Sequence, residues 1–213
     1  MEYKKKYKFI ILFIIGVFLV LCGCDTSSSD KLFTNLDPVR IGIGFRNDIQ
    51  ETMQNNILKN EYYYNGGGVA AGDINNDGLA DVYFSGNMVS NKLYLNKGNW
   101  KFEDITSPSG TEGRKDWATG VAMVDINGDG WLDIYVCYSG NTPGEGYNLP
   151  VIRNMPNRAN QLFINQGCEP GGVPVFKESA KEYGIDAIGT FSTQAYFFDY
   201  DNDGDLDMFL LNH

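Results

Sequence analysis

A twelve-residue segment occurs three times in this chain with little change. It reads DINNDGLADVYF from Asp73, DINGDGWLDIYV from Asp125 and DYDNDGDLDMFL from Asp199. Each copy places oxygen-bearing side chains at positions 1, 3, 5 and 9, and glycine at position 6. β-Branched and aromatic residues follow directly, so each copy predicts a polar loop that leads into a β-strand.

The oxygen spacing of these loops matches the needs of a hard cation. Calcium takes roughly six to eight oxygen ligands, and glycine allows the sharp turn that brings them round one point. No Cys or His lies within a loop, which disfavours zinc and copper, and magnesium rarely has an all-protein cage. We therefore expect structural calcium in at least two loops. The candidate ligands are the side chains of Asp73, Asn75, Asp77 and Asp81, of Asp125, Asn127, Asp129 and Asp133, and of Asp199, Asp201, Asp203 and Asp207, with the carbonyls of Leu79, Trp131 and Asp205.

Two other interpretations of the loops need comparison. A single Asp/Asn/Gly cluster is as readily an ordinary turn as a metal site, because these residues all favour turns. Three copies with one ligand register favour the metal site. An EF-hand requires a bidentate Glu at position 12 and flanking helices. Position 12 is Phe84, Val136 or Leu210, so the EF-hand is excluded.

The similarity between copies extends beyond the loops and predicts the fold. A short apolar strand precedes each loop, and two further matching segments, NKLYLNKG from Asn91 and NQLFINQG from Asn160, follow the first two loops. Each is followed by an aromatic-led strand, which gives four short antiparallel strands per repeat, as in a propeller blade. We expect an all-β fold, an incomplete propeller ring of about two and a half blades over residues 41–213. The repeats would span about 61–106, 115–180 and 189–213.

Other segments have weaker signals. RIGIGF from Arg40 predicts a strand, and the spacing of apolar residues after Asn47 predicts a short helix. Residues 140–158 are rich in Gly, Pro and Asn and form a loop insertion, which serves either recognition or no specific function. Cys137 and Cys168 could pair in an oxidising compartment or remain separate thiols.

The N-terminal segment MEYKKKYKFIILFIIGVFLVLCGC has the layout of a signal peptide. Its apolar run, Phe9 to Leu21, is short for a membrane span. The ending LCGC resembles the lipobox of bacterial lipoproteins, which implies cleavage after residue 23, lipidation of Cys24 and a tether over residues 24–40. Plain secretory cleavage and an uncleaved anchor remain alternatives. The expected location is the bacterial cell envelope, as an outer-membrane lipoprotein of undetermined face.

The charge balance limits the partners. The chain carries a net charge of −10, and removal of residues 1–23 leaves 13 basic and 26 acidic residues, a net charge of −13. Such a chain cannot neutralise phosphates, so nucleic acid is excluded as a partner.

The stretch YNGGGVAAGDINNDGLADVYFSGNMVSNKLYLNKG, from Tyr64 to Gly98, resembles the FG-GAP/VCBS repeat family. Repeats of this family form the β-propeller of integrin α-subunits, and the closer likeness is to bacterial cartilage-acidic-protein-like VCBS proteins. The resemblance covers about Phe45 to His213 and implies calcium binding by the D-x-[DN]-x-D-G-x-x-D loops. Members of the family are longer, so we expect an N-terminal portion of a longer propeller, with self-association into a ring as the alternative.

These features favour a non-enzymatic, calcium-stabilised and lipid-anchored module that binds a glycan or a protein at the cell envelope. A polysaccharide lyase or hydrolase would need a carboxylate pair or a His/Tyr/Arg group outside the loops, and the acidic residues there show no such spacing. We therefore expect no catalytic residues. A structural subunit of an outer-membrane assembly is a further alternative.

Overall fold

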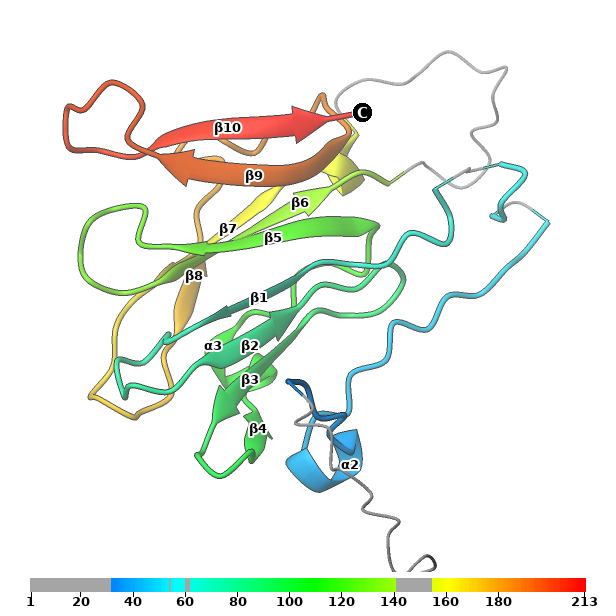
Figure 1. The fold of residues 1–213 in the computed structure, drawn as a ribbon. Helices are drawn as coiled ribbons and strands as arrows, with labels where there is room; N and C mark the ends of the chain where they lie inside the picture. Colours follow the sequence, from blue (N-terminus) through cyan, green and yellow to red (C-terminus); the bar gives the residue numbers. More distant parts are fainter. Residues whose placement is uncertain (1–31, 54, 60–61, 141–154) are drawn as a thin grey trace, which may run out of the picture. The chain divides into compact units, whose positions relative to one another are not determined.

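The structure is a computed structural model that describes residues 32–53, 55–59, 62–140 and 155–213 (Figure 1). The chain divides into two compact units, Met1–Leu36 and Asp37–His213. Residues 32–36 of the first unit contain no helix or strand. Cys24 and residues 141–154 of the insertion lie outside the described residues. No helix in the described ranges is both long and apolar enough to span a bilayer.

The second unit consists mainly of antiparallel sheets, which confirms the all-β prediction. Two sheets have four strands each, in sequential order, and a third has two strands. The first sheet contains β1 (Val69–Gly72), β2 (Asp81–Phe84), β3 (Lys92–Asn96) and β4 (Phe102–Asp104). The second contains β5 (Ala118–Val124), β6 (Asp133–Tyr138), β7 (Gln161–Asn165) and β8 (Phe176–Glu178), and the third contains β9 (Ser192–Phe198) and β10 (Asp207–Asn212). This is the arrangement of partial propeller blades.

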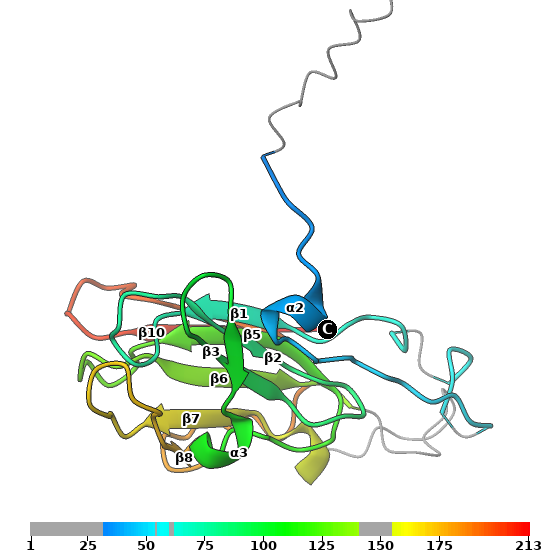
Figure 2. The same ribbon diagram turned by 90° about the horizontal axis from the view of Figure 1, so that it is seen from below.

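The first strands of the three sheets lie side by side, with β5 between β1 and β9 (Figure 1). Figure 2 shows β1 and β5 again as neighbours. Two apolar cores result. Strand β6 is buried along its whole length because it serves both: Ile134 and Val136 face the core shared with the first sheet, whereas Tyr135 and Cys137 face the core shared with the third. Alternate residues of a strand point to opposite faces, so a central blade needs apolar residues at every position.

Two weaker sequence predictions are wrong. The segment from Arg40 is not a strand, because Arg40 and Ile41 end the short helix α2 (Pro38–Ile41). Asp37 caps this helix by accepting the N–H of Val39 at 3.0 Å, and Gly42 ends it with φ of 87°. The described residues of the segment 47–59, where the short helix was expected, contain no helix. Local hydrogen bonds between side chains and the backbone compete with a helix there. For example, the N–H of Asn55 donates to Thr52 Oγ1 at 3.0 Å.

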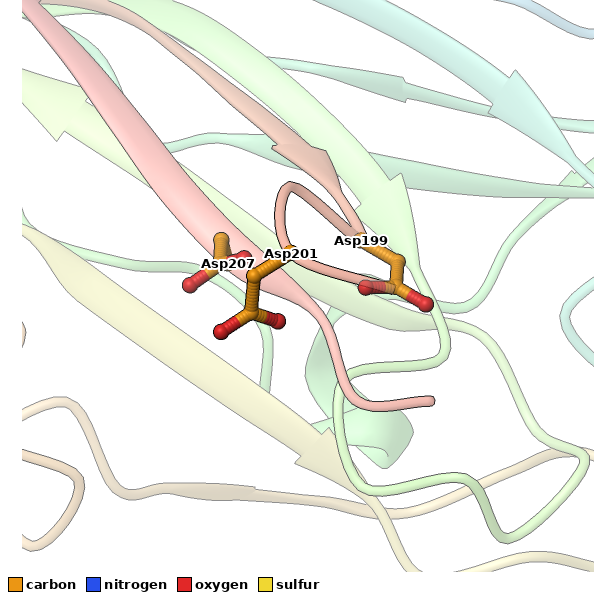
Figure 3. A group of neighbouring side chains, drawn as sticks. All are labelled: Asp199, Asp201 and Asp207. Carbon is orange, nitrogen blue, oxygen red and sulfur yellow. The ribbon is translucent and has the colours of Figure 1, made fainter. Parts of the chain in front are cut away.

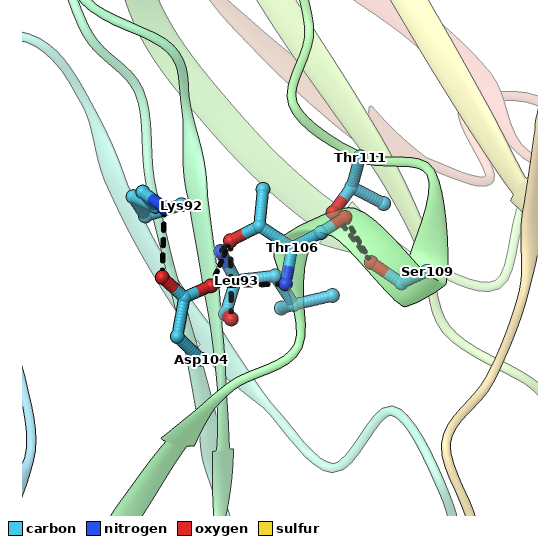
Figure 4. A network of polar contacts seen from close by, with 6 residues as sticks. All are labelled: Lys92, Leu93, Asp104, Thr106, Ser109 and Thr111. Carbon is cyan, nitrogen blue, oxygen red and sulfur yellow. Dashed lines mark hydrogen bonds and ion pairs between the residues drawn. The ribbon is translucent and has the colours of Figure 1, made fainter.

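A network of polar contacts joins β3, the end of β4 and the helix that follows it (Figure 4). This helix, α3 (Thr106–Ser109), was not predicted from the sequence. Buried Thr106 accepts the N–H of Leu93 at 3.0 Å and donates to Asp104, which also pairs with Lys92 at 2.7 Å. The network anchors the segment after β4 to β3. A short 3-10 helix, η1 (Pro156–Arg158), precedes β7.

The two cysteines among the described residues do not pair. Cys137 is a free thiol within the core and Cys168 is a free, half-buried thiol. Burial raises the pKa of the Cys137 thiol to about 12. A thiol held in its neutral form in this way behaves as a small apolar side chain.

Candidate metal centre

The three repeated loops connect the first and second strand of each sheet and share one hydrogen-bond pattern. The carboxylate at position 1 accepts the backbone N–H groups of positions 5 and 6. These distances are 3.1 and 2.7 Å for Asp73, 3.0 and 2.8 Å for Asp125, and 3.2 and 3.1 Å for Asp199. Each loop therefore curls round its first aspartate.

The carboxylate at position 5 tightens the same turn. Asp77, Asp129 and Asp203 accept the N–H groups of Leu79, Trp131 and Asp205 at 2.9, 2.9 and 3.1 Å. The last three residues are those predicted to offer carbonyl ligands.

Two backbone positions explain why the loops contain Asn and Gly. Position 6 has a φ of 84° at Gly78, 88° at Gly130 and 95° at Gly204. Position 4 is also left-handed, with φ of 56° at Asn76 and 62° at Asn202, and glycine stands there in the second loop. Residues with a Cβ are strained in this region, and Asn tolerates it best.

The aspartates at position 9 fix the loops to the sheets. Oδ2 of Asp81, Asp133 and Asp207 accepts the N–H of position 2 at 3.0, 3.1 and 2.8 Å. In the first two sheets Oδ1 also accepts the N–H of Asn96 or Asn165, at 2.7 and 2.8 Å. The sequence predicted these aspartates as metal ligands, and in the structure their hydrogen bonds hold each loop against its sheet. Each carboxylate oxygen still has a lone pair that could bind a cation.

Burial and neighbouring charge act on two of these carboxylates. Burial raises the pKa of Asp81 and of Asp133 to about 6, against the lowering effect of their backbone N–H donors. Repulsion from Asp77 and Asp73, or from Asp129 and Asp125, raises it further. A divalent cation beside them would favour the ionised form.

The third loop brings three predicted ligands together. Asp199, Asp201 and Asp207 offer oxygens that all lie within 4.8 Å of one another, so this cluster could hold a metal ion (Figure 3). In the same loop, a side-chain hydrogen bond with Asp203 raises the pKa of Asp205. Among the described residues, no other group of three Asp, Glu, Cys or His side chains has its ligand atoms this close together. The carboxylates of the first and second loops are therefore farther apart than those of the third loop.

Asn75 gives the first loop a different feature. Its side chain is fully buried, at 0% exposure, and its Nδ2 donates to Asp77 Oδ2 and to the carbonyl of Gly172, both at 3.2 Å. Its Oδ1 has no hydrogen-bond donor. A buried acceptor left without a partner costs about 1–3 kcal/mol, and a cation would supply the missing interaction.

The sequence did not assign a role to Asn96 and Asn165. Besides the N–H donated to the position-9 aspartate, Asn96 Nδ2 donates to Ala80 O at 2.9 Å, and Asn165 Nδ2 to Leu132 O at 3.2 Å. The signal was present in the matching segments NKLYLNKG and NQLFINQG, where both residues occupy the same position.

Residues 73–136 match the family model described as FG-GAP-like repeat. The chain contains an FG-GAP-like repeat. The matched residues begin at the first aspartate of the first loop and end within β6, so they include both loops of the four-stranded sheets. The loop from Asp199 follows the same hydrogen-bond pattern outside this range.

Cartilage acidic protein 1 of two vertebrates is similar to part of this chain. The protein of Xenopus tropicalis is 38% identical over 72 residues, and that of Mus musculus is 33% identical over 72 residues. Each alignment covers 34% of this chain and 11% of the relative, so the similarity is partial and distant.

Proposed function

We propose that this protein is a calcium-binding β-propeller module whose ions stabilise the blades. The observation that carries the proposal is the convergence of Asp199, Asp201 and Asp207 within 4.8 Å. Calcium prefers carboxylate, amide and carbonyl oxygens, which are the groups that the repeated loops supply. In the first loop the donor-free Oδ1 of Asn75 supports the same assignment.

The ion would act on folding rather than on a reaction. Ten of the proposed ligands are carboxylates, which repel one another unless a cation neutralises them. Each loop connects two strands of one sheet, so a bound ion adds its binding free energy to that of the folded blade. Extracellular calcium modules work at about 10⁻⁴–10⁻³ M ion, and we expect the same range here.

Thermal unfolding tests this proposal. A chelator should lower the melting temperature, and millimolar calcium should restore it, whereas equal magnesium should restore less because it keeps its waters. Asp199→Asn together with Asp201→Asn should reduce the calcium effect. Asp48→Asn, which alters an exposed pair with Arg46, serves as the control. A melting curve that neither chelator nor calcium moves would reject the proposal.

We also propose that the module is lipid-anchored at the cell envelope. The support is the N-terminal sequence, which ends in LCGC at Cys24. In a bacterial host, Cys24→Ser should abolish incorporation of labelled fatty acid and maturation, whereas Cys22→Ser, at the variable position, should preserve both. Equal labelling of the two variants would contradict the anchor.

The proposed partner is a glycan or a protein that meets the loops at one end of the blades. Propellers often carry recognition on such loops because the sheets hold them rigidly. A glycan array and a pull-down from envelope extracts, each with calcium and with chelator, separate the two partner classes. Loss of every signal in chelator would link recognition to the ions.

A further inference from the structure

The first loop is bonded to the second sheet as well as to its own. Asn165 Nδ2, from the end of β7, donates to Ile74 O at 2.9 Å. Gly171 N–H donates to Asn75 O at 3.2 Å, and Asn75 Nδ2 donates to Gly172 O at 3.2 Å. The two glycines belong to the β7–β8 turn, residues 166–175. A turn of one blade thus contacts the loop of another.

These contacts determine which atom of the Asn75 amide is left for a ligand. The backbone carbonyl is occupied by Gly171 N–H, and the side-chain nitrogen by Gly172 O and Asp77. The remaining polar atom, Oδ1, is fully buried and without a donor. Rotating the amide would place oxygen against two acceptors, so the turn fixes its orientation.

The equivalent residues of the other loops lack this support. Asn127 is exposed, and its Oδ1 already accepts Asp129 N–H at 3.2 Å. Asp201 in the third loop is exposed. No hydrogen bond between described residues joins the second loop to the third sheet. The first loop therefore has a pre-oriented, desolvated ligand that the others do not.

We propose that the β7–β8 turn is a positioning element of the first metal site. By holding Asn75, it makes the first loop the tightest calcium site of the chain, and it links calcium binding in one sheet to the packing of the next. This inference rests on the proposed calcium binding. Ligands held in place before binding lose less freedom when the ion arrives, which raises affinity.

The coupling runs in both directions. If the packed turn raises the affinity of the first loop for calcium, calcium must stabilise the packed turn by the same factor. A change in the turn should therefore act on one class of site only, although the turn supplies no side-chain ligand.

Gly171→Ala tests the turn. Gly171 has φ of 77°, and an added Cβ would lie 3.8 Å from Asp77 Cβ. Gly184→Ala is the matched control, because Gly184 has φ of 72° and an added Cβ would meet nothing within 4 Å. Backbone strain is thus similar, but only Gly171 adjoins the loop. In calcium titration calorimetry of the full chain in detergent, Gly171→Ala should weaken the tightest site by about tenfold. Gly184→Ala should leave it unchanged.

A second pair of variants tests the ligand itself. Asn75→Ala should remove the tightest class of site, whereas Asn127→Ala should leave that class intact and affect only a weaker one. This pair keeps the inference open to refutation if Gly171→Ala fails to fold. Terbium luminescence, excited through nearby aromatic residues, provides an independent count of the sites that remain.

The outcomes distinguish a failure of the proposed calcium binding from a failure of the positioning role of the turn. A native chain that takes up no calcium rejects the proposed function. The positioning role of the turn is rejected, and the proposed function kept, in two cases. In the first, calcium binds but Gly171→Ala and Gly184→Ala change the affinity of the tightest site equally. In the second, Asn75→Ala and Asn127→Ala change it equally.

Discussion

Asp81 and Asp133 are buried carboxylates that must meet two opposing demands. Each accepts two backbone N–H groups, which favours the ionised form. Each also lies in a desolvated position near two other aspartates, which favours the protonated form, and the pKa of each rises to about 6. Desolvation is the larger effect, so these two residues make the stability of the protein depend on both pH and cations.

We expect the calcium-free protein to lose stability as pH rises between about 4 and 6. An unfolded Asp has a pKa of about 3.9, so in this range the folded chain binds more protons than the unfolded chain. Stability then falls with increasing pH, and the loss is complete above the folded pKa of about 6. Calcium binds the ionised form, so its stabilising effect should grow over the same range. Melting temperatures at pH 5.0 and 7.5, in chelator and in calcium, measure both trends.

A pair of variants distinguishes the effect of the buried aspartates on the pH dependence of stability from the effect of the other acidic residues. Asp81→Asn removes one titrating group and should flatten the decline in chelator, although loss of one acceptor lowers stability throughout. Asp48→Asn removes the same charge from an exposed site and should preserve the decline. A melting temperature in chelator that rises from pH 5.0 to 7.5 would contradict the assignment.

At the scale of elements, repetition made the strands predictable. Every segment predicted as a blade strand is one in the structure, because each combines β-prone residues with a neighbour of matching pattern. The segments that were misjudged occur once. At Arg40, the capping residue Asp37 and the helix-ending Gly42 outweighed strand propensity. Thr106–Ser109 form a helix because of contacts to β3 rather than a helical period.

The ligand spacing within each loop could be predicted from the sequence, but the contacts between the first loop and the second sheet could not. The ligand spacing within twelve residues is a local property, so it could be identified from the sequence. The contact between Asn75 and Gly172 joins residues 97 positions apart and depends on how two sheets pack. A single sequence contains no signal for that pairing. The same holds for Asn165, which reaches Ile74 across 91 positions.

At the scale of the Asp37–His213 unit, the third sheet has two apolar faces, and the described residues cover only one of them. Ala195, Phe197, Met208 and Leu210 face the core shared with the second sheet. On the opposite face, Tyr196 pairs with Phe209 across the strands, and these side chains are 56% and 59% exposed. Leu211 lies on the same face at 48% exposure. A strand that is apolar on both faces is suited to lie between two layers.

We therefore expect residues 1–213, purified in detergent, to self-associate through this face in a concentration-dependent way. Phe209→Lys should shift the distribution toward monomer in analytical ultracentrifugation, because a charge opposite Tyr196 is costly to bury in a contact. Leu58→Lys is the control, since Leu58 is 80% exposed and belongs to neither strand of the third sheet. Equal association of both variants would place the contact elsewhere. Dissociation by Phe209→Lys alone, with an unchanged melting temperature, would show that the uncovered face of β9 and β10 drives assembly, as expected for a blade whose outer face packs against another sheet.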